Sequence, residues 1–536
     1  MKSVMNHRFS QIPKAQIQRS VFDRSHGYKT TFNEGYLVPF YVDEVLPGDT
    51  INLRASLFGR LATPIVPIMD NMFLETFWFY VPNRLVWNNW ERMNGAQDNP
   101  GDSIDFTVPQ VKTTGGFAIQ SIFDYMGLPT GVGNLSINSL PLRAYNLIWN
   151  EWFRDENLQD SVTVEKGDTD SETNYKLLKR GKRHDYFTSA LPWPQKGEGV
   201  EVPLSATIVG DDETAMSFGM SATPFYGNGY AGITSLASSN KSFSPGENIL
   251  TTENNNNRSA LRYSWSGNKT YSDIAEHLQL ANATQSPLTI NSLRQAFQIQ
   301  KLLERDARGG TRYTEILRSH FGVISPDARL QRPEYLGGSS TRININPVEQ
   351  TSSSNDTTPQ GNLAAFGTLS DSFHGFTKSF VEHGILIGLV NVRADLTYQQ
   401  GLNRMWSRKT RYDYYFPVLA HLGEQTILNK EIYAQGNEQD DKVFGYQERY
   451  AEYRYFPSMI TGKFRSTYSQ SLDVWHLSQK FENLPVLNDE FIEDNPPISR
   501  VIAVQDEPHF LLDCYFKCLH ARPMPVYSVP GLVDHF

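Results

Sequence analysis

The sequence predicts a mainly β fold with few helices and long irregular loops. Three observations support this prediction: β-favouring apolar segments lie near both ends of the 536-residue chain, few segments show a helical period, and long polar stretches separate them. Long structureless loops are uncommon in compact proteins, because they need a surface to pack on. We therefore expect the loops to pack against neighbouring copies of the chain in a repeating assembly.

The first strands are expected between residues 36 and 81. Residues 36–42 (YLVPFYV) are apolar and β-favouring, and the Pro-Gly pair at 47–48 indicates a chain reversal after them. Residues 73–81 (FLETFWFYV) form a long aromatic run with little alternation. Such a run predicts a strand that is covered on both faces.

The clearest strand signal lies near the C-terminus, between residues 508 and 523. Phe510, Leu512, Cys514, Phe516 and Cys518 recur with a period of two and therefore share one face. Four residues of strand separate the two cysteines by about 13 Å, whereas disulfide partners need Cα atoms within about 7 Å. We expect two core thiols and no disulfide between them.

Two segments have a helical period. Residues 142–153 follow Pro141 and place Tyr145 and Trp152 on one stripe, and residues 292–307 end before a Gly-Gly pair. The remaining long stretches are expected to be loops, at 95–133, 167–199 and 337–361. The most polar stretch is 221–270, where Ser, Thr, Asn and Gly make up 27 of 50 residues, and we expect an exposed insertion or lid there.

Composition limits the class of protein. A net charge of −9 argues against a chain whose whole surface binds nucleic acid. Two cysteines exclude a disulfide-rich scaffold and a four-cysteine zinc site. The N-terminus lacks the apolar segment of a secretory signal, and the longest apolar stretch, 384–390, is far shorter than the ~18 residues that span a bilayer. We expect a soluble protein of a reducing compartment, without membrane insertion.

No stretch of the sequence predicts catalysis. The chain has no zinc-protease, serine-hydrolase or Walker phosphate-loop motif. A dinucleotide-like match at 227–232 (GNGYAG) lies in the polar stretch without a following helical pattern, so we interpret it as a flexible loop. The twelve histidines show no metal-ligand spacing. We expect no catalytic residue, no metal site and no cofactor.

Positive charge is concentrated in two places. Residues 1–30 carry six cations and one acid, and residues 1–34 are interpreted as an extended basic arm. A second group lies at 176–184. Each is either a solvated segment or a contact with phosphates or with a neighbouring subunit. The candidate contacts are Lys2, Arg8, Lys14, Arg19, Lys176, Lys179, Arg180, Lys182, Arg183 and His184.

Several blocks of the sequence resemble one known family, the major capsid proteins of gokushoviruses within the Microviridae. They extend from residue 22 to about residue 520, and together they are far more specific than any single motif. The blocks are FDRSH at 22–26, KTTF at 29–32, VDEVLPGDT at 42–50, RLATPI at 60–65, PNRLVW at 82–87, LKRGKRHDYFTS at 178–189, LPWPQKG at 191–197, SPDARLQRPEYLGG at 325–338, AHLGEQ at 420–425 and YRY at 453–455.

This resemblance implies a structural protein. The implied fold is an eight-stranded antiparallel jelly roll of the viral capsid type, with large inserted loops and a few short helices. Residues 35–536 would form this single domain, with an insertion at about 198–290 as a surface protrusion. Copies would form a T=1 icosahedral shell around a circular single-stranded DNA genome, as a virion assembled in the bacterial host cytoplasm.

The resemblance also implies partners. These are further copies of the chain, the packaged DNA, a small basic DNA-binding protein, a minor DNA pilot protein and a host cell-surface receptor. The local charge of the two basic segments, rather than a family motif, makes them our candidates to face the DNA, and the resemblance implies that the insertion touches the host. Candidate host contacts in the insertion are Tyr226, Tyr230, Asn254, Asn255, Tyr263 and Trp265.

A competing hypothesis is a jelly-roll carbohydrate-binding protein or a glycan-acting enzyme, with the loops forming a cleft. Adjacent carboxylates such as Asp43 and Glu44 could be assigned to such a site. Neighbours in a strand point to opposite faces, however, so these pairs do not form an acid/base site by themselves.

Overall fold

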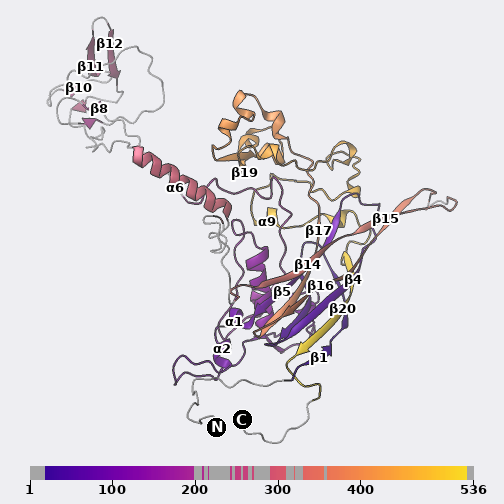
Figure 1. The fold of residues 1–536 in the computed structure, drawn as a ribbon. Coiled ribbons are helices and arrows are strands. Elements are labelled where there is room, and N and C mark those ends of the chain that lie inside the picture. The colour runs from indigo at the N-terminus through magenta and orange to yellow at the C-terminus, as the bar shows by residue number, and fades with distance from the viewer. Residues whose placement is uncertain are drawn as a thin grey trace. The chain divides into compact units, whose positions relative to one another are not determined.

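The structure is a computed structural model of the 536-residue chain (Figure 1). It describes residues 18–197, 330–354 and 359–527, together with 208–209, 215–216, 242–243, 248–254, 257–262, 269–270, 290–309 and 319. Contacts divide the chain into two compact units, one of residues 1–196 and 306–536 and one of residues 197–305. The two are described separately.

The larger unit contains two antiparallel sheets. The six-stranded sheet has the order β1-β20-β4-β16-β15, and β2 also pairs with β20. Its strands are β1 (Ser20–Asp23), β2 (His26–Phe32), β4 (Thr50–Leu61), β15 (Asn344–Glu349), β16 (Leu363–Ser379) and β20 (Phe510–Arg522). The four-stranded sheet has the order β14 (Glu334–Arg342), β5 (Met72–Pro82), β17 (Gly384–Ala394) and β3 (Val38–Val45).

The two sheets face each other across one hydrophobic core. Strand β20 alternates buried and exposed residues along most of its length, and its inward face carries Phe516. The ring of Phe40 in β3 lies 5.5 Å from that of Phe516 and 5.2 Å from that of Trp78 in β5, so side chains of both sheets interdigitate. The predicted mainly β, antiparallel fold of the capsid jelly-roll type is confirmed, whereas the count of eight strands stays a prediction.

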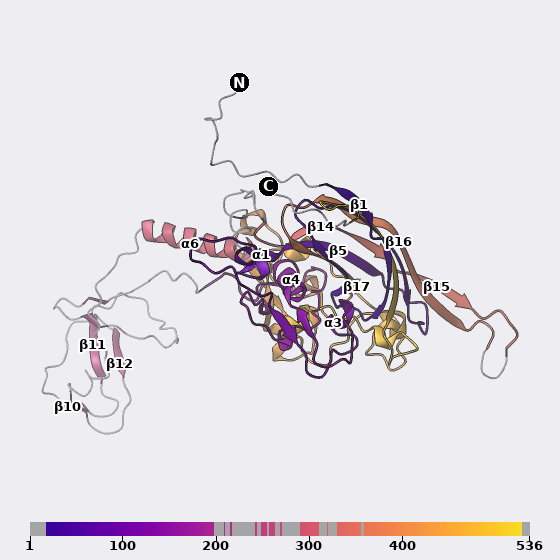
Figure 2. The same cartoon turned by 90° about the horizontal axis from the view of Figure 1, so that it is seen from below.

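The outer face of the four-stranded sheet is covered. A second core packs helices α1 (Asn83–Val86), α3 (Ile122–Tyr125) and α4 (Leu140–Ile148) against β5 and β17 (Figure 2). Strand β17 is therefore buried along its whole length, which explains its unbroken apolar sequence. Strand β5 is likewise mostly buried on both faces, as predicted for residues 73–81.

The helical predictions are confirmed with small changes of boundary. Helix α4 continues as a π-helical turn over Trp149–Phe153, and α6 spans Ile290–Gly309. Other short helices are α2 (Trp90–Met93), α8 (Asn429–Ile432) and α9 (Asp489–Ile492). The 3-10 turns are Glu172–Asn174, Arg404–Ser407, Arg411–Asp413, Pro417–Leu419, Glu438–Asp441, Ala451–Tyr453, Gly462–Phe464, Asp473–Trp475 and Ile498–Arg500.

Small two-stranded sheets complete the described structure. In the larger unit these are β6 (Gln110–Lys112) with β7 (Ser136–Asn138) and β18 (Glu424–Leu428) with β19 (Val443–Glu448). In the smaller unit they are β8 (Ile208–Val209) with β9 (Ala215–Met216), β10 (Ser242–Phe243) with β13 (Lys269–Thr270), and β11 (Asn248–Asn254) with β12 (Asn257–Arg262).

The structure changes two expectations about loops and the arm. The expected loop at 337–361 is wrong, because most of β14 and all of β15 lie within it. Both strands are polar; β14 is partly exposed and β15 is largely exposed, so neither carries a hydrophobic alternation in its sequence. Residues 20–32 of the predicted basic arm form β1 and β2 of the six-stranded sheet, and residues 1–17 lie outside the described part. The predicted protrusion at 198–290 also falls largely outside it.

Candidate nucleic-acid interface

Two residues of the predicted basic cluster at 176–184, Arg180 and Arg183, fold onto one carboxylate, Glu75 in β5. Arg180 forms an ion pair with Glu75, and Arg183 and Arg393 place guanidinium nitrogens 3.2 Å and 2.9 Å from its carboxylate oxygens. Arg183 also pairs with Asp395 at 3.0 Å. Burial would raise the pKa of Glu75, but the charges of Arg180 and Arg393 outweigh it and lower that pKa. Glu75 therefore remains an anion in the protein interior.

Aromatic rings hold the same guanidinium groups. Arg180 lies 4.6 Å from the ring centre of Phe77, and Arg183 lies 4.4 Å from that of Phe73. Burial lowers the pKa of Arg180 to about 10. Each arginine is thus fixed between an acid and a ring, which leaves little freedom to meet a ligand.

Lys182 is buried as well. Its Nζ donates hydrogen bonds to the carbonyl of Phe491 at 2.6 Å and to Oε1 of Gln479 at 2.9 Å. Burial lowers the pKa of Lys182 to about 8, and burial raises the pKa of the neighbouring Asp494 to about 7. Lys182 therefore stabilises contacts inside the fold and is almost inaccessible at the protein surface.

The remaining cluster residues are more accessible. Lys179 pairs with Glu493 at 3.6 Å and lies over the ring of Tyr36. Lys176 and His184 are exposed, and neither forms an ion pair within the described part of the chain. DNA contact by the cluster stays a prediction, and these two residues are its solvent-facing members.

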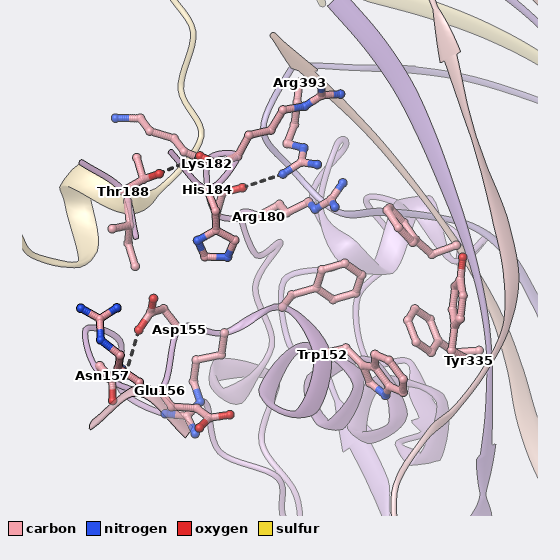
Figure 3. Close-up of a pocket in the computed structure, with 18 of the residues that line it drawn as sticks. Trp152, Asp155, Glu156, Asn157, Arg180, Lys182, His184, Thr188, Tyr335 and Arg393 are labelled. Atoms are coloured by element: carbon pink, nitrogen blue, oxygen red, sulfur yellow. Dashed lines mark hydrogen bonds between the residues drawn. The ribbon is translucent and has the colours of Figure 1, made fainter. Parts of the chain in front are cut away.

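A cavity of about 1010 Å³ lies beside the cluster. Figure 3 shows Trp152 and Tyr335 on one side of it and Arg180 and Arg393 above. Concave aromatic walls can hold a planar group or a side chain of another protein. The arginines that line it already have partners, so the cavity offers its aromatic rings on one side and polar residues such as Asp155 and Asn157 on another.

The other predicted DNA contacts belong to the arm. Arg19 is exposed and donates hydrogen bonds to Oγ1 of Thr50 at 3.2 Å and to the carbonyl of Ala521 at 3.3 Å. These contacts place it at the edge of the six-stranded sheet. Lys2, Arg8 and Lys14 lie outside the described residues.

The predicted host contacts are largely untested. Asn254 ends β11 and pairs with Asn257, the first residue of β12. The predicted contacts outside the described residues are Tyr226, Tyr230, Asn255, Tyr263 and Trp265.

Sequence reasoning missed the acids that neutralise the cluster. Glu75 gave a signal, because it is the one charged residue in the aromatic run at 73–81. A lone acid in a buried strand indicates an internal ion pair, since buried charges need partners. Asp395 and Arg393, far along the sequence, gave no such signal.

The described residues also bear on the expectations about metal sites, cysteines and membrane helices. They contain no group of three or more His, Cys, Asp or Glu residues that could hold a metal ion. Cys514 and Cys518 are free and buried, as predicted. Within the described part, no helix is long and apolar enough to cross a membrane.

Comparison with known proteins agrees with the fold. The family model described as capsid protein (F protein) matches residues 10–532. Capsid protein VP1 of Bdellovibrio phage phiMH2K is 50% identical, covering 99% of this chain and 98% of that protein. Capsid protein VP1 of Chlamydia phage 1 is 48% identical (99% and 98% covered), and that of Spiroplasma virus 4 is 36% identical (98% and 97%). The chain therefore belongs to the F-protein family of capsid proteins, among the gokushovirus members of the Microviridae.

Proposed function

We propose that this capsid protein assembles into a T=1 icosahedral shell that encloses a circular single-stranded DNA genome. A capsid role makes the chain a virion component and a subunit of a homo-oligomeric shell, without enzymatic activity. The glycan-acting alternative has lost its support, because capsid proteins match the chain from end to end. Triangulation number, genome type and assembly in the bacterial cytoplasm are the finer parts of the proposal.

The observation that carries the shell is a set of exposed apolar side chains in two segments of the chain. Segments 405–422 and 453–459 hold clustered aromatic and aliphatic side chains, and Arg408 lies over the rings of Tyr414 and Tyr453. Monomeric proteins rarely expose contiguous apolar patches larger than a few hundred Å². Interfaces, in contrast, are enriched in aromatic residues and arginine. The most exposed members are Trp406, Tyr412, Val418, Leu422 and Phe456.

Electron microscopy of the protein expressed in bacteria tests the shell. Uniform small particles with sixty-subunit symmetry would support it, and monodisperse monomers would contradict it. A variant with Trp406→Ser, Val418→Ser and Phe456→Ser should remain folded and fail to assemble. The matched control changes Val381→Ser and Val486→Ser, two exposed aliphatic residues outside these segments, and should assemble.

We propose that the insertion at about 198–290 contacts a receptor on the host cell. Its polar composition, without material for an ordinary core, supports an exposed role. Deleting residues 222–270 should leave particles intact and reduce their adsorption to host cells. Failure to assemble would make the segment an interface element instead.

For the DNA side, Lys176 and His184 are the cluster residues to change. Substituting Arg180 and Arg183 would remove two of the three guanidinium groups that neutralise the buried Glu75, so a loss of DNA there would report misfolding. The proposed virion partners, a small basic DNA-binding protein and a minor pilot protein, would be sought by mass spectrometry of purified particles.

A further inference from the structure

The outer face of the six-stranded sheet differs from that of the four-stranded sheet, because no described element covers it (Figure 1). Alternate residues of β4 and β20 point away from the core. Phe58, Leu511 and Tyr515 are each about half exposed, at 49%, 50% and 53%. We call this surface the open face and define it by Lys29, Arg54, Phe58, Arg60, Leu511, Asp513, Tyr515 and Lys517.

Strand register arranges these side chains in rows. Arg60 lies opposite Leu511, Phe58 opposite Asp513, Ser56 opposite Tyr515, and Arg54 opposite Lys517. Strands are about 4.8 Å apart and every second residue advances about 6.7 Å, so the two rings are diagonal neighbours. Cations flank the rings at both ends over about 20 Å from Arg60 to Arg54.

Most cations of the open face have no partner among the described residues, unlike most cations of the 176–184 cluster, and can therefore contact a ligand. Arg54, Arg60 and Lys517 form no ion pair or hydrogen bond through their side chains with the described residues. Lys29 pairs with Asp513 at 2.9 Å, but both side chains are more than half exposed. An exposed pair of this kind contributes little and can be exchanged for a phosphate contact.

The chain leads its basic N-terminal segment to the same sheet. Residues 1–19 contain Lys2, Arg8, Lys14 and Arg19 and no acid. Arg19 donates hydrogen bonds to β4 and β20, and β1 starts at the next residue. Arg19 therefore adds one positive charge beside the strands of the open face.

We propose that the open face binds the single-stranded genome, with bases stacked on Phe58 and Tyr515 and phosphates paired with Arg54, Arg60 and Lys517. This rests on the proposed enclosure of DNA. Aromatic rings between cations on a flat sheet are the elements that sequence-tolerant single-strand binding uses. A groove of about 630 Å³ at the end of the face offers room beside the first ring; Lys29, Phe58, Arg60 and Leu511 line it together with the acids Asp124 and Asp513.

A second copy of the chain fits the face less well. A two-fold contact would bring the same cations against each other, and like charges across an interface are repulsive. A polyanion satisfies those charges and uses both rings. The observations therefore favour DNA as the occupant.

Oligonucleotide binding tests the contact directly. The subunit is titrated with fluorescent oligo(dT) at several salt concentrations. The variant Arg54→Ala, Arg60→Ala, Lys517→Ala should reduce the salt slope by about 2, since a single strand contributes ~0.7 per phosphate contact. Phe58→Ala and Tyr515→Ala should each weaken binding about five-fold or more while leaving the slope unchanged. Wild-type values in the triple variant would overturn the proposal.

Matched controls make the result specific. Lys112→Ala, Lys409→Ala, Lys442→Ala removes the same charge at exposed positions elsewhere and should change the slope little. Lys176→Ala, His184→Ala tests the cluster. If the cluster variant loses oligonucleotide binding and the open-face variants bind like the wild type, the proposal is overturned in favour of the cluster.

Particle assays separate this inference from the proposed function. Open-face variants should form shells with less DNA, measured as the absorbance ratio at 260 and 280 nm and by genome copies per particle. Absence of particles from the wild-type chain would refute the shell itself. Open-face variants that bind oligo(dT) normally yet cannot assemble would make the face a contact between copies, and would refute only this inference.

Discussion

Replacing Glu75 by glutamine should destabilise the subunit strongly. The Glu75 side chain is only 10% exposed, and three guanidinium groups converge on it, with side chains 16%, 32% and 11% exposed. Removing one partner of a buried ion pair costs about 3–5 kcal/mol, because the opposite charge stays buried. Among the ion pairs of the described residues, Arg183 has a second one, with Asp395, whereas Arg180 and Arg393 have Asp494 as a further nearby acid, so Arg180 and Arg393 would bear most of that loss.

Urea unfolding of the dissociated subunit, followed by tryptophan fluorescence at pH 7, measures this cost. The matched control is Asp441→Asn, since Asp441 pairs with Lys430 at 2.6 Å but is 78% exposed. The control should lose about 0–1 kcal/mol. A Glu75→Gln variant that unfolds within 1 kcal/mol of the wild type would refute the buried network as a source of stability.

The pH dependence of the same variant has a definite sign. The pKa of Glu75 is lowered in the folded protein, so the ionised Glu75 contributes fully to the free energy of unfolding at pH values above its ordinary pKa of 4.5. It is lost as the pH falls through the folded value. The difference in free energy of unfolding between the wild type and Glu75→Gln should therefore become smaller as the pH is lowered.

Three further predictions follow from buried groups. Burial raises the pKa of Asp494 from 3.8 to about 7, so the wild-type free energy of unfolding decreases as the pH rises from 3.8 to about 7. The urea midpoint of Asp494→Asn should therefore exceed that of the wild type by a margin that grows from about pH 4 to 7. Above about pH 7 that margin should stay constant. Arg143 pairs with Asp170 at 2.7 Å with neither side chain exposed, so Arg143→Met should cost about 3–5 kcal/mol in the same assay. Burial raises the pKa of Cys514 to about 12, so Ellman's reagent should label it only in urea.

Local patterns predicted the strands that have a buried face. Residues 510–518 alternate because one face packs on the core, and residues 73–81 are apolar throughout because both faces are covered. The edge strand at 344–349 was missed for the same physical reason. It is paired on one side and largely exposed, so its sequence carries asparagine, proline and glutamate in place of alternation.

The basic cluster shows what residue spacing cannot provide. Its density of charge predicted acids, phosphates or solvent around it, and the sequence left the choice open. The acids that contact it come from positions 75, 395 and 493, brought together only by the fold. The cations of the open face, in contrast, are dispersed over several strands, so no window of sequence makes them look like a cluster.

The position of β20 within the six-stranded sheet determines when the strands of that sheet can pair during translation. This last strand lies between β1 and β2 on one side and β4 on the other, so residues near 20 and 60 meet partners beyond residue 510. At roughly 5–20 residues per second, the early strands wait about 25–100 s on the ribosome for the strand that joins them. The sheet closes only after nearly the whole chain has emerged. A chain that terminates before residue 510 therefore lacks the strand that joins β1 and β2 to β4.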